Sequence, residues 1–221
     1  MDRVRQRLLS LGSLVQEQLE LATDHVMHRR GGELVEARAV HVRTEKLEQE
    51  IEEECLHILA LHQPVAFDLR ELVSTLKMNA QLHRIGDLSW NLVKQADLLQ
   101  RKPGPAEAPF DLVTMVDTTR AMLELALDAV SDLDAELAKR VRAMDDTVDV
   151  IHRGMYPAVT AAIRCHPEHG GALMLMISIS RQYERIADYA RSIAKDVQYL
   201  AGGEIVRHVK RDAPARPAEP G

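Results

Sequence analysis

Apolar residues recur every three or four positions along most of the chain, the spacing that places them on one face of an α-helix. The pattern predicts three helices in the first half, over residues 2–28, about 33–62 and about 66–100. Gly31-Gly32 and Pro64 separate these segments, because glycine and proline interrupt helices. In the third helix we expect an apolar seam of Leu69, Leu72, Val73, Leu76 and Ala80.

Residues 101–109 break this pattern with three prolines, and proline cannot continue a helix. The helical pattern then returns over three segments, about 111–132, 134–164 and 172–200. Long helices joined by short turns are typical of antiparallel bundles. We therefore predict an all-α protein of two tandem three-helix bundles, six long antiparallel helices in all, over 1–100 and 110–201. The tail over 202–221 is expected to be disordered.

Composition narrows the class of protein further. Aromatic residues make up only 3 % of the chain, which favours helices over sheets. The formal net charge of -6 predicts no general attraction to nucleic acid. No stretch approaches the roughly 18 apolar residues of a membrane span, so we expect a soluble, cytoplasmic protein that reaches a membrane only through partners. Cys55 and Cys165 fall in apolar helical patterns and are expected to be buried, reduced thiols.

A short motif occurs twice. Residues 82–87 read Leu-His-Arg-Ile-Gly-Asp and residues 183–188 read Tyr-Glu-Arg-Ile-Ala-Asp. Each copy places a possible metal ligand four residues before an aspartate, and positions i and i+4 share a helix face. The pairs are His83 with Asp87 and Glu184 with Asp188. In each half the pair continues the expected apolar seam, where an unpaired carboxylate would be costly to bury.

The preceding helix of each half carries a second i, i+4 pair, Asp145 with Asp149 and His41 with Glu45. Carboxylates and imidazoles that converge from neighbouring helices are the usual components of a metal site in a bundle. The all-oxygen set of the second half suits hard ions such as Mg²⁺, Mn²⁺ or ferric iron. The two imidazoles of the first half shift the preference toward Zn²⁺, Fe or Ni, so we predict non-identical sites.

Other interpretations remain open. Nearby arginines could form salt bridges with these carboxylates instead: Arg43, Arg84, Arg142 and Arg185. A carboxylate-bridged di-metal enzyme of the ferritin-like type is a second possibility, although that class uses Glu-x-x-His motifs at i, i+3, which do not occur here. A metal-free helical scaffold is a third. The sequence contains no glycine-rich phosphate loop, nucleophile elbow or catalytic Cys/His pair, so we predict no enzymatic activity.

The surroundings of the first motif are also distinctive. Residues 63–70 read Gln-Pro-Val-Ala-Phe-Asp-Leu-Arg, and Asn91 follows the motif. This arrangement closely resembles the PhoU family of phosphate-uptake regulators. The family pattern is a Q-P-x-A-x-D-L-R turn and an E-R-I-G-D or E-R-I-A-D helix, in two tandem three-helix bundles. The resemblance covers residues 1 to about 200.

The resemblance implies a cytoplasmic, non-enzymatic negative regulator. Such a protein couples the phosphate ABC transporter to a sensor histidine kinase and keeps phosphate-starvation genes off when phosphate is plentiful. It also implies a homodimer and metal ions, in multinuclear clusters, held by E-x-x-x-D pairs that here correspond to Glu184 and Asp188. The chain departs from the pattern at His83, where the family has glutamate, and at His41, where an acid is usual. Because histidine is a competent ligand, we expect an altered first cluster rather than a lost one.

Overall fold

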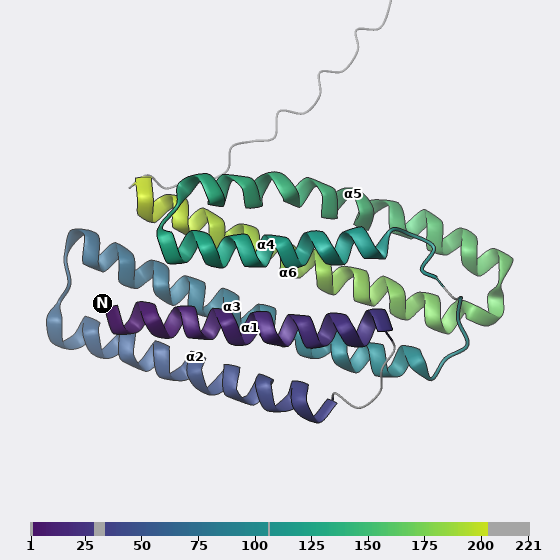
Figure 1. Ribbon diagram of the computed structural model, residues 1–221, viewed down its shortest axis with the longest axis horizontal. Coiled ribbons are helices and arrows are strands. Elements are labelled where there is room, and N and C mark those ends of the chain that lie inside the picture. Colours follow the sequence, from purple (N-terminus) through teal and green to yellow (C-terminus); the bar gives the residue numbers. More distant parts are fainter. Residues whose placement is uncertain (1, 29–33, 106, 203–221) are drawn as a thin grey trace, which may run out of the picture.

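The computed structural model describes residues 2–28, 34–105 and 107–202 (Figure 1). Within these ranges the chain forms long α-helices and one short 3₁₀ helix, and no strand. The elements are α1 (Asp2–His28), α2 (Leu34–His62), α3 (Ala66–Gln100), α4 (Leu112–Asp132), α5 (Ala135–Cys165), η1 (Pro167–His169) and α6 (Gly170–Gly202). The predicted all-α fold of two three-helix bundles is confirmed. The tail expected to be disordered lies outside the described residues from 203 onward.

The two bundles pack side by side along their length (Figure 1). Helices α1, α2 and α3 pack together, as do α4, α5 and α6, and the halves meet where α3 packs on α6 and α1 on α4. Polar contacts cross this junction. The guanidinium of Arg120 donates from Nε to Glu20 Oε1 at 2.8 Å, and the hydroxyls of Thr23 and Tyr183 are 3.2 Å apart. The halves therefore share one continuous core.

Local signals explain the helix ends. The carboxylate of Asp111 accepts a hydrogen bond from the backbone N–H of Thr114, and that of Asp134 accepts from the N–H groups of Glu136 and Leu137. Each aspartate thus satisfies donors that a helix start leaves free. Helix α4 ends at Asp132, and the next residue, Leu133, has a φ of 53° in the left-handed region.

The predicted helix limits need small corrections. Glu33, the expected start of the second helix, lies outside the described residues, and α2 begins at Leu34. The last helix was expected to begin at about residue 172, yet Gly170 and Gly171 already form the first residues of α6. The turn before them is instead made by Pro167, which starts η1. Proline has no N–H to satisfy and its φ suits a first helical position, so it can begin this turn.

The expected seam of α3 is partly wrong. Leu72 is buried, but Leu69, Val73 and Ala80 are exposed, with Leu69 40 % and Val73 38 % accessible. The face that packs into the core instead contains Leu72, Met78, Leu82, Ile85 and small polar residues such as Ser74, Thr75 and Asn79. The prediction failed because buried serine, threonine and asparagine were assigned to the polar face.

The two thiols also differ from each other. Cys55 is fully buried in the core, as expected, whereas Cys165 at the end of α5 is exposed. The prediction of two buried thiols is therefore wrong for Cys165.

Candidate metal centres

The second-half cluster comprises Asp145 and Asp149 on α5 and Glu184 and Asp188 on α6. These two helices pack against each other along much of their length. Asp145 is only 4 % exposed, and the other three carboxylates are partly buried. Burial raises the pKa of Asp145, and the negative charges of Asp149 and Asp188 add to the effect. Burial likewise raises the pKa of Glu184, with contributions from the other three carboxylates. The four groups are therefore close enough to repel one another, as a cation-binding cluster requires.

An arginine already neutralises part of this charge. Arg191 Nη1 lies 3.0 Å from Asp145 Oδ2, and Arg191 Nη2 pairs with Asp188 one turn earlier on α6. The guanidinium therefore bridges α5 and α6 at the position where a cation would compensate the same two carboxylates. A metal bound by Asp145 and Asp188 would have to displace Arg191, because both cations would need the same oxygens.

The first-half cluster combines two histidine–carboxylate pairs. His41 Nε2 lies 3.6 Å from Glu45 Oε1 on α2, and His83 Nε2 lies 3.6 Å from Asp87 Oδ2 on α3. The pairs lie near each other, since Asp87 and His83 both influence the pKa of His41. Burial is the main influence and lowers that pKa, so the imidazole is neutral at neutral pH. Neutral imidazole is the form that binds metals.

A buried glutamine orients His41. Gln18 Nε2 donates to the carbonyl oxygen of Gly86 at 2.9 Å and lies 3.2 Å from His41 Nδ1. Since an amide nitrogen can only donate, His41 Nδ1 is the acceptor and its proton is on Nε2, facing Glu45. Trp90 stacks on the same imidazole with ring centroids 5.8 Å apart. Metal binding through Nε2 would therefore require the Gln18 amide to turn over.

Two residues of these clusters, Glu48 and Arg191, were not predicted from the sequence. Glu48 lies on α2 three residues after Glu45, and its pKa is raised chiefly by burial, while His83 lowers it. It belongs to the first cluster, because His83 and Asp87 both influence its pKa. Arg191 lies three residues after Asp188 and could have been found from that spacing. The arginines named as possible partners behave differently: Arg84 pairs with Asp87 at 3.5 Å, whereas Arg43 pairs with Glu17 at 2.9 Å.

The donor types fit the metals predicted from the sequence, but the ligand atoms do not converge on a single position where an ion could bind. None of the eight predicted ligands belongs to a trio of His, Cys, Asp or Glu whose ligand atoms all lie within 4.8 Å of one another. The oxygen-rich cluster on α5 and α6 could hold a hard ion once Arg191 moves away. The cluster on α2 and α3 could hold a borderline metal through His83, Asp87 and the neighbouring carboxylates. Both metal sites stay predictions.

The fold and these paired clusters define a class of tandem three-helix bundle in which each half carries polar pairs on its last two helices. Comparison with known families agrees with this class. The PhoU domain model matches residues 8–96 and again residues 112–197. The chain therefore belongs to the PhoU family, and the resemblance drawn from its motifs is confirmed.

Individual relatives agree over nearly the whole chain. The phosphate-specific transport system accessory protein PhoU homolog of Pseudomonas putida is 32 % identical over 95 % of this chain and 82 % of its own length. The crystal structure of PhoU from Pseudomonas aeruginosa is 31 % identical, with a TM-score of 0.88 over 92 % of this chain and 97 % of that one. The phosphate transport system regulatory protein PhoU from Streptococcus pneumoniae shares the fold, with a TM-score of 0.80 at 24 % identity.

Among the described helices, none combines the length and apolar character needed to cross a membrane.

Proposed function

We propose that this protein is a non-enzymatic, cytoplasmic negative regulator of phosphate uptake and of phosphate-starvation signalling. In this role it acts as an adaptor between the phosphate ABC transporter and a sensor histidine kinase, and it works as a homodimer. When phosphate is plentiful, contacts with both partners keep the kinase from activating starvation genes.

The observation that supports this role best is the match of both halves to the PhoU domain. Curated relatives that align over 95 % of the chain are named accessory proteins of the phosphate-specific transport system. The long helices offer extended faces on which two partners could bind at once. One such face lies where α2 meets α3, because Leu61, Val65 and Phe67 are exposed there.

We further propose that metal ions bound to the helix faces belong to this function. A hard ion would be held in the second half by Asp145, Asp149, Glu184 and Asp188. A different ion would be held in the first half by His41, Glu45, His83 and Asp87. Burial, and after it the mutual repulsion of the carboxylates, raises the pKa values of Asp145 and Glu184, and a bound cation would offset both effects. It would also change the charge of the face that α5 and α6 present to a partner.

Deletion of the gene in cells grown at high phosphate tests the regulatory role. Transcripts of phosphate-scavenging genes should rise in the deletion strain and return to the wild-type level when the intact gene is restored. Unchanged transcripts would remove the proposed function and leave the fold untouched.

A set of complementing variants then tests the metal. A gene carrying Glu184→Gln and Asp188→Asn should restore repression poorly at normal protein levels. A gene carrying Glu124→Gln, which changes an exposed carboxylate on α4, should restore it fully. Full repression by the double variant would separate the regulatory role from the α5–α6 cluster.

A further inference from the structure

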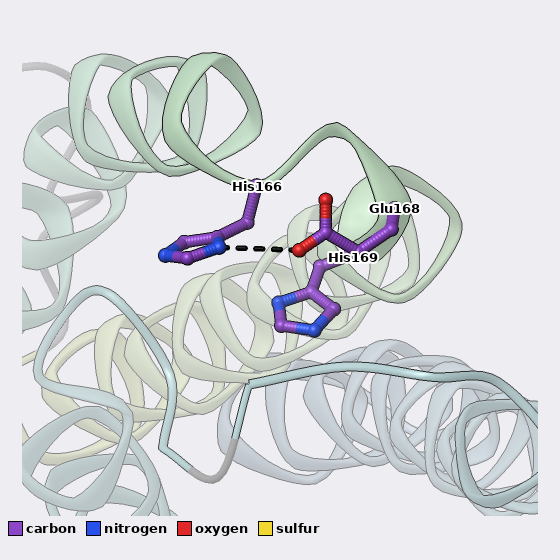
Figure 2. Close-up of side chains that lie close together, drawn as sticks. All are labelled: His166, Glu168 and His169. Atoms are coloured by element: carbon purple, nitrogen blue, oxygen red, sulfur yellow. Dashed lines mark hydrogen bonds and ion pairs between the residues drawn. The ribbon is translucent and has the colours of Figure 1, made fainter.

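The turn between α5 and α6 brings two imidazoles and a carboxylate together, away from the clusters described above. The side chains are His166, Glu168 and His169, and one ligand atom from each lies within 4.8 Å of the other two. Figure 2 shows both rings and the carboxylate around one small space on the outside of the turn. In the described part of the chain, no other trio of His, Cys, Asp or Glu meets this distance.

Backbone hydrogen bonds hold this turn in place. The N–H of His166 donates to the carbonyl oxygen of Ala162 at 2.9 Å, which completes the last turn of α5. Pro167 then starts η1, and the N–H of His169 donates to the carbonyl oxygen of His166 at 3.0 Å. All three ligands therefore come from four consecutive residues. Gathering them around an ion closes only a very short loop, so the entropy cost is small.

The spacing of the three side chains also suits a cation. His166 Nδ1 lies 3.2 Å from Glu168 Oε1. The rings of His166 and His169 stack with their centroids 5.4 Å apart. Two imidazoles and a carboxylate at these separations can share one metal ion.

We propose that His166, Glu168 and His169 form a surface site for a borderline divalent transition metal, with Zn²⁺ as the representative ion. Two nitrogens and one carboxylate oxygen are a donor set that Zn²⁺ and its neighbours in the first transition row accept readily. Three protein ligands leave a coordination position open, to be filled by water or by a group from a partner. The bound ion would tie the end of α5 to the turn that begins α6.

This site is distinct in position from both proposed clusters on the helix faces, and distinct in chemistry from the all-oxygen cluster on α5 and α6. The α5–α6 cluster offers only oxygen, and its ligands come from separate helices. The site at the turn has two imidazoles on one short segment. The two sites can therefore be removed independently by substitution.

Zinc titration of the full-length, untagged protein tests the proposal, after treatment with EDTA and removal of the chelator. Isothermal titration calorimetry should show one zinc equivalent that is absent from the His166→Ala/His169→Ala variant. Loss of outer-shell partners alone typically weakens metal binding about 10–100-fold, so removal of two ligands should weaken this site by at least about tenfold. Glu168→Gln, which keeps the shape of the side chain but not its charge, should give an intermediate loss.

His62→Ala is the matched control, because His62 is exposed at the equivalent turn of the first half. This variant should bind zinc as the wild type does. His83→Ala and Glu184→Gln/Asp188→Asn should also keep this zinc equivalent, which separates the site at the turn from both helix-face clusters. Zinc should raise the melting temperature of the wild type and not that of the double-histidine variant.

Equal zinc stoichiometry and affinity in the double-histidine variant and the wild type would overturn the proposal. So would an equal loss in His62→Ala. Because all three ligands lie on an exposed turn, far-UV circular dichroism should show native helix content in every variant.

Discussion

Replacement of Arg191 by methionine tests whether a metal ion and this arginine compete for the α5–α6 carboxylates. The substitution removes the guanidinium but keeps an unbranched apolar stem of similar length. In the wild type, Arg191 Nη1 lies 3.0 Å from Asp145 Oδ2, and the side-chain exposures are 31 % for Arg191 and 5 % for Asp145. The variant would leave Asp145 buried among like charges, with Lys195 as the remaining cation near it.

The expected loss of stability follows from these exposures. Breaking a buried ion pair on one side costs about 3–5 kcal/mol, whereas an exposed pair contributes about 0–1 kcal/mol. Asp145 is buried but Arg191 is about one-third exposed, so solvent screening reduces the first figure. We expect Arg191→Met to lower the free energy of unfolding by about 1.5–3 kcal/mol when no metal is present.

Urea denaturation in EDTA, followed by circular dichroism, measures this loss, and Arg140→Met is the control. Arg140 is exposed on α5, so its replacement should leave the denaturation midpoint nearly unchanged. In the presence of Mn²⁺, Arg191→Met should bind the ion more tightly than the wild type does. The bound ion should then restore the stability that the variant loses in EDTA. Wild-type stability of the variant in EDTA, or weaker Mn²⁺ binding, would refute the competition between arginine and metal.

Further predictions concern the junction and the core. Burial raises the pKa of Asp196, despite hydrogen bonds from Gln81 and Lys77 that lower it. The folded state therefore holds this proton more tightly than the unfolded state does, and stability is lost as pH rises from the unfolded to the folded pKa. Asp196→Asn should remove that part of the pH dependence and unfold at a higher urea concentration at pH 7; an unchanged pH profile would contradict this. Iodoacetamide at pH 8 should modify exposed Cys165 in the native protein. It should reach Cys55, whose pKa burial raises to about 11, only after unfolding, as peptide mass spectrometry can verify. Tyr183→Phe removes the hydroxyl contact that joins α6 to α1 and should cost about 1 kcal/mol in urea denaturation; no measurable cost would show that this contact does not stabilise the junction.

Helix positions were largely predictable from the sequence because their limits depend on local chemistry. Pro64 and the aspartates that cap α4 and α5 act on the backbone within a few residues of themselves. The orientation of a helix about its axis was less predictable. Helix α3 contacts α1, α2 and α6 at once, so it buries small polar residues together with its apolar ones. Apolar periodicity therefore identified the helix and misplaced its seam.

The candidate sites show the same limit. Spacing at i and i+4 correctly placed members of a pair on one helix face, since the contacts of His41 with Glu45 and of His83 with Asp87 have that spacing. The pairing of α5 with α6 through Arg191 depends on the distance and rotation between two helices, which no local pattern contains. The turn at 166–169 was not predicted as a site, because it lies between the predicted helices 134–164 and 172–200 and carries no i, i+4 pair of ligands.

The anomalous scattering of manganese in crystals grown with Mn²⁺ would test most directly whether these helix faces are metal centres. The account predicts an anomalous peak among Asp145, Asp149, Glu184 and Asp188, with Arg191 turned away from Asp145. A crystal with no peak between α5 and α6, in which Arg191 still bridges Asp145 and Asp188, would contradict it.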